Sequence, residues 1–186
     1  NVLLGTSNGA TTLDVDYGTS AINVTVPAKG TTTATLNISG ANDGYLIKKL
    51  ITKLSMSVPT NGDLRNLSAR LVSPDGTTSV LLFQNVIGGA TKFEETTFTD
   101  DSVTPLGTNV SPVQSGFVSN GYNNPILPLA QFNGTVAKGI WKLVVTNNGT
   151  LPATIQKFSL TLSKPLLGSG LGDPIADQTS LAFRIF

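Results

Sequence analysis

Apolar residues along the chain alternate with polar ones or gather in short runs, and helical spacing is almost absent. Residues 21–26 alternate and end at Pro27, and residues 33–38 alternate and end at Ser39-Gly40. A period of two is the pattern of a half-buried β-strand. Runs of the same kind predict further strands at residues 67–72, 79–83, 93–98, 140–146 and 154–162.

Residues 45–58 form a longer β-rich stretch without one simple period. Four of its apolar side chains can share a face if a β-bulge intervenes, namely Leu46, Leu50, Leu54 and Met56. On another apolar strand lies Trp141, the only Trp of the chain, which we expect to anchor the core rather than to bind a ligand.

Turn residues separate the predicted strands. Ser73-Pro74-Asp75-Gly76 divides two of them, because proline presets φ and glycine accepts a positive φ. Asn-Gly pairs begin at residues 8, 61, 120, 133 and 148, and Asp-Gly pairs begin at residues 43 and 75. Such pairs suit type I′ turns. Many short strands joined by turns predict one all-β sandwich or barrel, which needs no disulfides at this length.

Two flanks lie outside the dense strand pattern. Residues 1–19 have little apolar content beyond their first few positions, and we assign them to an N-terminal extension. Residues 164–186 open with a glycine-rich linker and end in an alternating stretch that puts Leu181, Phe183 and Ile185 on one face. An apolar strand behind a linker has to pair, either with its own sheet or with the edge of another molecule.

Residues 101–128 differ from the rest of the chain, because they are rich in proline and glycine. They predict a long ordered loop with one short strand at residues 116–119. Long loops on a β scaffold often carry function, although a loop that only covers one end of the sandwich is the simpler interpretation.

The residue types that are missing exclude several kinds of chemistry. None of the 186 residues is Cys or His, which excludes Ser-His-Asp and Cys-His catalysis, disulfides and the usual zinc sites. Only 12% of the residues are charged and the net charge is +1, so the chain has no electrostatic footprint for nucleic acid. No apolar run approaches the roughly 20 residues of a membrane-spanning helix. A composition dominated by Thr, Ser, Asn and Gly is common in secreted β-proteins, so we expect an extracellular or cell-surface location.

Carboxylates remain as candidates for metal binding. Asp100 and Asp101 close the densest acidic segment, residues 94–101, and could offer oxygens to calcium at a strand end. Surface acids without a ligand are the simpler interpretation, and a carboxylate pair for glycoside hydrolysis is the least favoured one. Asp14-Val15-Asp16 resembles the start of a calcium loop, but its twelfth position is Thr25 rather than Glu, and we do not assign a site there.

A series of short motifs occurs in an order that is typical of one family. Gly62-Asp63-Leu64 is followed by Leu-Val-Ser-Pro-Asp-Gly-Thr-Thr at residues 71–78. The other motifs are residues 22–27, residues 96–101, Pro128-Leu129 with Phe132-Asn133-Gly134, residues 139–143 (Gly-Ile-Trp-Lys-Leu) and Phe158-Ser159-Leu160. Together they resemble the P domain, or Homo B domain, which follows the catalytic domain in proprotein convertases and many bacterial subtilisin-like proteases. The resemblance covers residues 20–163, which we assign to the sandwich, between the extension at 1–19 and the linker and terminal strand at 164–186.

The resemblance implies a jelly-roll-like antiparallel β-sandwich and a non-catalytic role in a secreted protein. Because some members of the family bind calcium, it also implies calcium ligands at the matching positions Asp63, Asp100 and Asp101. Two departures weaken that implication: Val58-Pro59-Thr60 stands where His-Thr is frequent, and residues 146–148 (Thr-Asn-Asn) replace the usual aspartate.

Three functions are compatible with this sequence, and none is enzymatic. The first is an extracellular structural or interaction subunit that assembles with itself by strand addition through Leu181, Phe183 and Ile185. The second is an accessory P domain of a secreted subtilisin-like protease, which stabilises or positions a covalently linked catalytic domain. The third and weakest is a carbohydrate-binding module, for which Tyr17, Tyr45 and Tyr122 are few and scattered along the chain.

Overall fold

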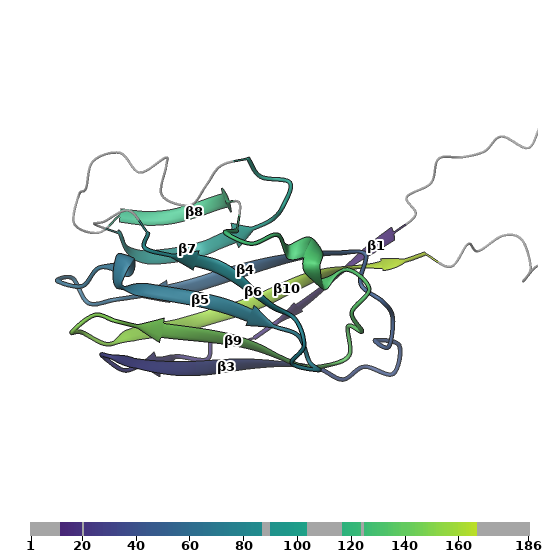
Figure 1. Cartoon of the computed structure of the whole chain (residues 1–186), viewed down its shortest axis with the longest axis horizontal. Helices are drawn as coiled ribbons and strands as arrows, with labels where there is room; N and C mark the ends of the chain where they lie inside the picture. The colour runs from purple at the N-terminus through teal and green to yellow at the C-terminus, as the bar shows by residue number, and fades with distance from the viewer. Residues whose placement is uncertain (1–11, 20, 87–89, 104–116, 124, 167–186) are drawn as a thin grey trace, which may run out of the picture.

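A computed structural model describes residues 12–19, 21–86, 90–103, 117–123 and 125–166 (Figure 1). Nearly all regular structure in these residues is β. The strands are β1 Thr12–Gly18, β2 Val24–Val26, β3 Gly30–Ile38, β4 Lys49–Ser57, β5 Leu67–Val72, β6 Ser79–Gln84, β7 Ala90–Phe98, β8 Phe117–Asn123, β9 Gly139–Asn147 and β10 Ala153–Pro165. Two short 3-10 helices, η1 Leu64–Asn66 and η2 Leu129–Phe132, precede β5 and β9.

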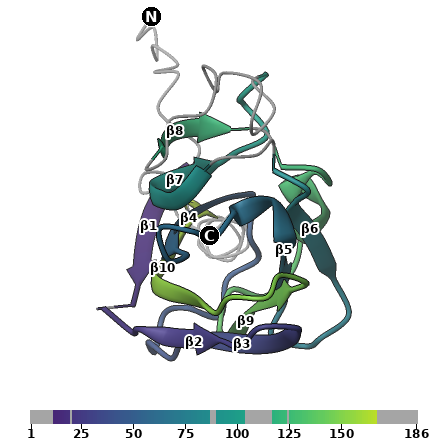
Figure 2. The ribbon, with the colours of Figure 1, turned by 90° about the vertical axis from the view of Figure 1, so that its left-hand side faces the viewer.

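The strands form two sheets that face each other across one core (Figure 2). The larger sheet has the order β1-β10-β4-β7-β8, with β2 also paired to β10, and the smaller sheet has the order β3-β9-β5-β6. Neighbouring strands are antiparallel except for β7 and β8, which run parallel. The predicted all-β sandwich is therefore confirmed.

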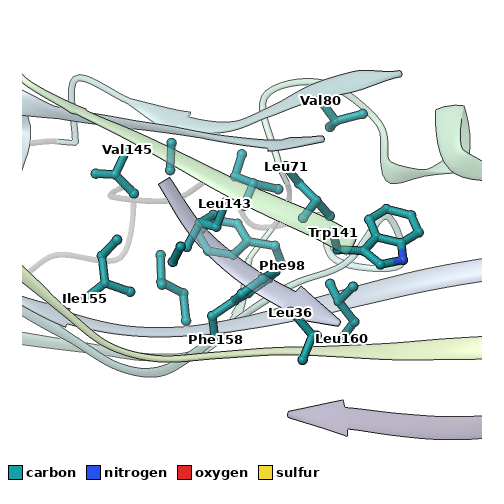
Figure 3. Close-up of a cluster of buried hydrophobic side chains, with 14 of the residues drawn as sticks. Leu36, Leu71, Val80, Phe98, Trp141, Leu143, Val145, Ile155, Phe158 and Leu160 are labelled. Carbon is teal, nitrogen blue, oxygen red and sulfur yellow. The ribbon is translucent and has the colours of Figure 1, made fainter. Parts of the chain in front are cut away.

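The core lies between the sheets and is closed by aromatic side chains from both (Figure 3). Phe83 packs edge-on against Phe93, with ring centroids 5.0 Å apart, and stacks on Phe98 at 6.0 Å. Trp141 is fully buried, and its indole N–H donates to the carbonyl oxygen of Ala137 at 2.9 Å. The prediction that Trp141 anchors the core is confirmed, since a buried indole needs such a partner.

Strand β4 alternates without a bulge of its own. Leu50, Leu54 and Met56 are buried, but Leu46 leaves 52% of its surface exposed, so the prediction that it shares their face is wrong. The irregularities lie on the neighbouring strands instead, in β7 opposite residues 54–56 and in β10 between Ile155 and Lys157. Because the neighbours carry the extra residues, β4 keeps its period of two. Leu46 lies in the loop before β4, so the alternation of the strand does not determine the side to which it points.

Strand β1 extends the larger sheet into residues that we assigned to the N-terminal extension. Val15 and Tyr17 are half-buried on its inner side, while Asp14 and Asp16 on the outer side accept hydrogen bonds from the hydroxyls of Ser163 and Thr161. Charged residues are common on edge strands. The acidic segment that resembled a calcium loop is thus an edge strand.

The predicted turn at Ser73-Pro74-Asp75-Gly76 is confirmed, with Gly76 at φ +74° and its N–H donating to the oxygen of Ser73. The expectation of type I′ turns is wrong for the described Asn-Gly and Asp-Gly pairs, because none of their Asn or Asp residues has a positive φ. At Asn133-Gly134 the dihedral angles are those of a type II turn, with only the glycine at positive φ.

The two ends of the sandwich carry different features. At one end β1 begins and β10 finishes, with Thr12 opposite Pro165; we call this the exit end (Figure 1). The start of β4 and the finish of β7 lie at the same end. At the opposite end are the β9–β10 turn, the finish of β4 and the start of β5.

Candidate functional site

Asp100 follows β7 at the exit end and holds η2 in place. Its two carboxylate oxygens accept the N–H groups of Leu129 at 2.8 Å and Ala130 at 2.7 Å. These are the first residues of η2, whose N–H groups have no partner within so short a helix. Asp100 therefore caps η2 from a distant strand, and both of its oxygens are engaged.

Asp101 lies beside Asp100 but points to a different partner. It forms an ion pair with the Lys49 ammonium, and both side chains are partly exposed. A cavity of about 230 Å³ near these groups is lined by both aspartates, by Lys48 and Lys49, and by Asn133. With two ammonium groups on its wall, this cavity is a poor match for a divalent cation.

Asp63 caps the other short helix, η1. One of its oxygens accepts the Arg65 N–H at 2.8 Å, and the other lies 2.7 Å from Nε of the Arg65 guanidinium. Asp63 lines a polar cavity of about 220 Å³ together with Asn66 and Asn147.

The structure does not bring the three predicted calcium ligands together. Asp63 follows β4 at the opposite end, whereas Asp100 and Asp101 follow β7 at the exit end, one strand length away. A nine-residue strand spans about 30 Å. Among the described residues no group of three or more Asp, Glu, His or Cys side chains could hold a metal ion. Calcium binding at either end stays a prediction, which melting temperatures with calcium and with a chelator can test.

Asn147 belongs to the segment 146–148 that replaces the aspartate implied by the P-domain resemblance, and its amide has a structural role. The side chain is 1% exposed. Its Oδ1 accepts the Gly149 N–H and its Nδ2 donates to the Leu151 oxygen, both at 2.8 Å. A carboxylate could make only the first of these bonds, so the β9–β10 turn requires the amide.

The motif segments contact one another and form a framework for the fold. Phe132 of η2 packs edge-on against Trp141 with ring centroids 5.2 Å apart. Gly139, which opens the Trp141 strand at φ +131°, lies so close to Pro74 that a Cβ at Gly139 would be 2.5 Å from the proline Cβ. The motif residues therefore supply contacts between distant segments of the chain, and these contacts stabilise the sandwich.

An apolar groove at the exit end was not predicted. It is lined by Leu13, Asn42, Tyr45, Leu46, Lys48, Lys164, Pro165 and Leu166, with a volume of about 690 Å³. The residues come from β1, from the loop before β4 and from the end of β10, so no single sequence segment shows the groove. The exposed leucines form one patch only because the fold places these segments side by side.

Two tyrosines that we described as scattered meet beside this groove. The Tyr17 hydroxyl donates to Asp43 at 2.6 Å and lies 3.2 Å from the Tyr45 hydroxyl. Burial, reinforced by the bonds to Asp43 and Tyr45, raises the pKa of Tyr17 far above its ordinary value, and burial also raises the pKa of Tyr45. Both rings are half-buried, so they close the core at this end rather than form a flat aromatic platform.

The predicted assembly residues Leu181, Phe183 and Ile185, and the linker that precedes them, lie outside the described residues. In the described ranges no helix is long and apolar enough to cross a membrane.

Comparison with known proteins agrees with these motifs. The family model of the proprotein convertase P-domain matches residues 47–162, from the loop before β4 to near the end of β10. The motif at residues 22–27, which we included in the resemblance, lies outside this match. No curated protein matches the chain. Because the match covers more than half of the chain, this protein belongs to the proprotein convertase P-domain family.

Proposed function

We propose that this protein is a secreted, non-catalytic module that stabilises or positions a covalently linked protease domain. In its family the P domain is an accessory domain joined to a protease domain, and P domains occur in secreted proteases. An extracellular location also agrees with a composition dominated by Thr, Ser, Asn and Gly and with the low content of charged residues.

The observation that carries the proposal is that polar groups of the motif residues form hydrogen bonds within the fold. Asp100 binds the N–H groups of Leu129 and Ala130, and Trp141 packs on Phe132 and bonds to Ala137. The Asp100 carboxylate and the Trp141 indole N–H are both engaged in hydrogen bonds within the fold, which supports a structural role for the motif. Catalysis instead requires groups positioned toward a reacting atom.

The proposal is tested by joining the full chain to the catalytic domain of a secreted subtilisin-like protease from which its own P domain has been removed. We expect the fusion to release more active protease into the medium and to lengthen its half-life on heating. A mixture of the two separate proteins is the matched control and should do neither. Equal half-lives with and without the fused chain would contradict the proposal.

Self-association through Leu181, Phe183 and Ile185 remains an alternative function for the same module. Within the described part of the chain, β1 is an edge strand with a partner on one side only, so the larger sheet can accept a further strand. Light scattering of the full chain and of a form that lacks residues 164–186 tests this alternative, since self-association requires a smaller particle after the deletion.

A further inference from the structure

Large apolar side chains are exposed around the exit-end groove. Leu13, Leu46 and Leu166 leave 46%, 52% and 45% of their surfaces exposed around one cavity of about 690 Å³. Val136 lies opposite Leu46 in an isolated antiparallel bridge, whose hydrogen bonds are made by the flanking residues, and it is exposed to 46%. Single exposed leucines are ordinary, but a contiguous apolar patch marks a contact surface.

The wall of the groove is held in place by polar contacts behind it. Tyr45 is fixed by Tyr17, which in turn bonds to Asp43, and the Lys164 ammonium lies 6.0 Å from the centre of the Tyr45 ring. The Ile47 N–H and the Ala137 N–H tie the loop before β4 to the segment after η2. A preformed groove loses little conformational entropy when it is filled.

We propose that residues 181–186 of the same chain dock in this groove as a strand beside β1. Leu181, Phe183 and Ile185 alternate with Ala182 and Arg184, so one side of such a strand is apolar and covers the exposed leucines. The outer edge of β1 has no strand partner among the described residues, and it supplies backbone groups for pairing.

The linker between the groove and the docking segment has a suitable length. Leu166 lines the groove itself, and residues 167–180 include Gly168, Gly170 and Gly172. A random-coil chain of that length and glycine content would have an end-to-end distance of about 20 Å, which would allow the segment to return to its starting point. A tether of this kind raises the effective concentration of the segment to the order of mM.

Charge also favours this occupant. Lys48 and Lys164 stand at the rim of the groove, and neither has an ion-pair partner in the part of the chain that the structure describes. Residues 167–180 carry Asp173 and Asp177 and no basic residue. The linker thus brings two carboxylates to two ammonium groups.

The experiment uses the lack of cysteine in the full chain. A Gly44→Cys variant, in which the new side chain meets open space, receives a nitroxide label beside the groove. We expect the amide resonances of residues 181–186 to lose most of their intensity through paramagnetic broadening. A Thr150→Cys variant, labelled before β10 at the opposite end, is the control and should leave them sharp.

A groove substitution shows whether the docking is specific. Leu46→Asp in the labelled Gly44→Cys protein should restore the lost intensity, whereas Ile140→Asp, at a residue of similar exposure outside the groove, should not. Fluorescence melts followed at Trp141 verify that both variants remain folded.

Three results would overturn the proposal. Sharp resonances with the label at residue 44, or broadening that persists in Leu46→Asp, would show that the segment does not use the groove. Broadening of an isotope-enriched, unlabelled copy by a labelled copy mixed with it would make a second copy the occupant. None of these results affects the proposed accessory function, because the fusion experiment does not depend on this groove.

Discussion

The carboxylate of Asp100 accepts the N–H of Leu129 at 2.8 Å, although the two residues are 29 positions apart in the chain. This bond fixes the start of η2 against the finish of β7, and η2 in turn presses Phe132 onto Trp141. Asp100, for which the P-domain resemblance implies a role as a calcium ligand, therefore caps η2 in this structure.

Substitution of Asp100 should cost more stability than substitution of its neighbour. Asp100→Asn places an amide nitrogen against one of two N–H donors, so we expect the free energy of unfolding to fall by about 1–2 kcal/mol. Asp101→Asn removes only an exposed ion pair with Lys49 and should cost less than about 1 kcal/mol. Urea denaturation followed by Trp141 fluorescence measures both, and equal losses would contradict the capping role.

Asn147→Asp should destabilise the β9–β10 turn strongly at neutral pH. The buried carboxylate cannot donate to the Leu151 oxygen and faces it with a negative charge, so the loss should be about 2–4 kcal/mol. Protonation returns a donor to the side chain, and the deficit should shrink as the pH is lowered from 7 toward 4. Asn148→Asp, at an exposed position, is the matched control; a comparable loss there would refute the explanation.

The Tyr17 hydroxyl should make the protein sensitive to alkali. Burial, followed by the bonds to Asp43 and Tyr45, raises the folded-state pKa of Tyr17 above the ordinary value of about 10. Above that pH the unfolded chain releases the proton while the folded chain keeps it, so the free energy of unfolding falls as pH rises. Urea denaturation between pH 8 and 11 should show a smaller fall in Tyr17→Phe, which at pH 7 should cost about 1 kcal/mol.

Gly139 should not tolerate a side chain. Its φ of +131° is strained for any other residue, and a Cβ would stand 2.5 Å from the Cβ of Pro74. We expect Gly139→Ala to lower the free energy of unfolding by about 2–3 kcal/mol or more. A Cβ at Gly44 would have no atom within 4 Å, so Gly44→Ala should change the free energy of unfolding by less than about 0.5 kcal/mol. Thermal melts of the two variants measure both changes.

The strands that face the core on one side could be predicted from the sequence. Leu67–Val72 was predicted with the bounds that β5 has, because its buried and exposed residues alternate without interruption. Strand β1 was missed because aspartates are rare in strands, and here Asp14 and Asp16 occupy the outer side of an edge. Leu46 was misplaced because β4 begins only at Lys49, so the alternation that buries Leu50 and Leu54 does not extend to it.

The site was less predictable than the fold for a geometric reason. Trp141 could be assigned to the core because its own strand is apolar. The separation of Asp63 from Asp100 depends on the antiparallel pairing of β4 with β7, which places residues near in motif order at opposite ends. The contact of Tyr17 with Tyr45 likewise depends on a loop that folds over β1, and single segments carry no sign of it.

The pairing of Thr12 with Pro165 places the first and last paired residues of the sandwich next to each other. Cα atoms of opposed residues in an antiparallel pair are only about 5 Å apart. A linker of a few residues could therefore join the two points into a ring, and new ends could be opened at the exposed turn around Gly76. For the same reason, a host protein could carry the sandwich as an insert in one of its surface loops, with almost no change in the course of its own backbone.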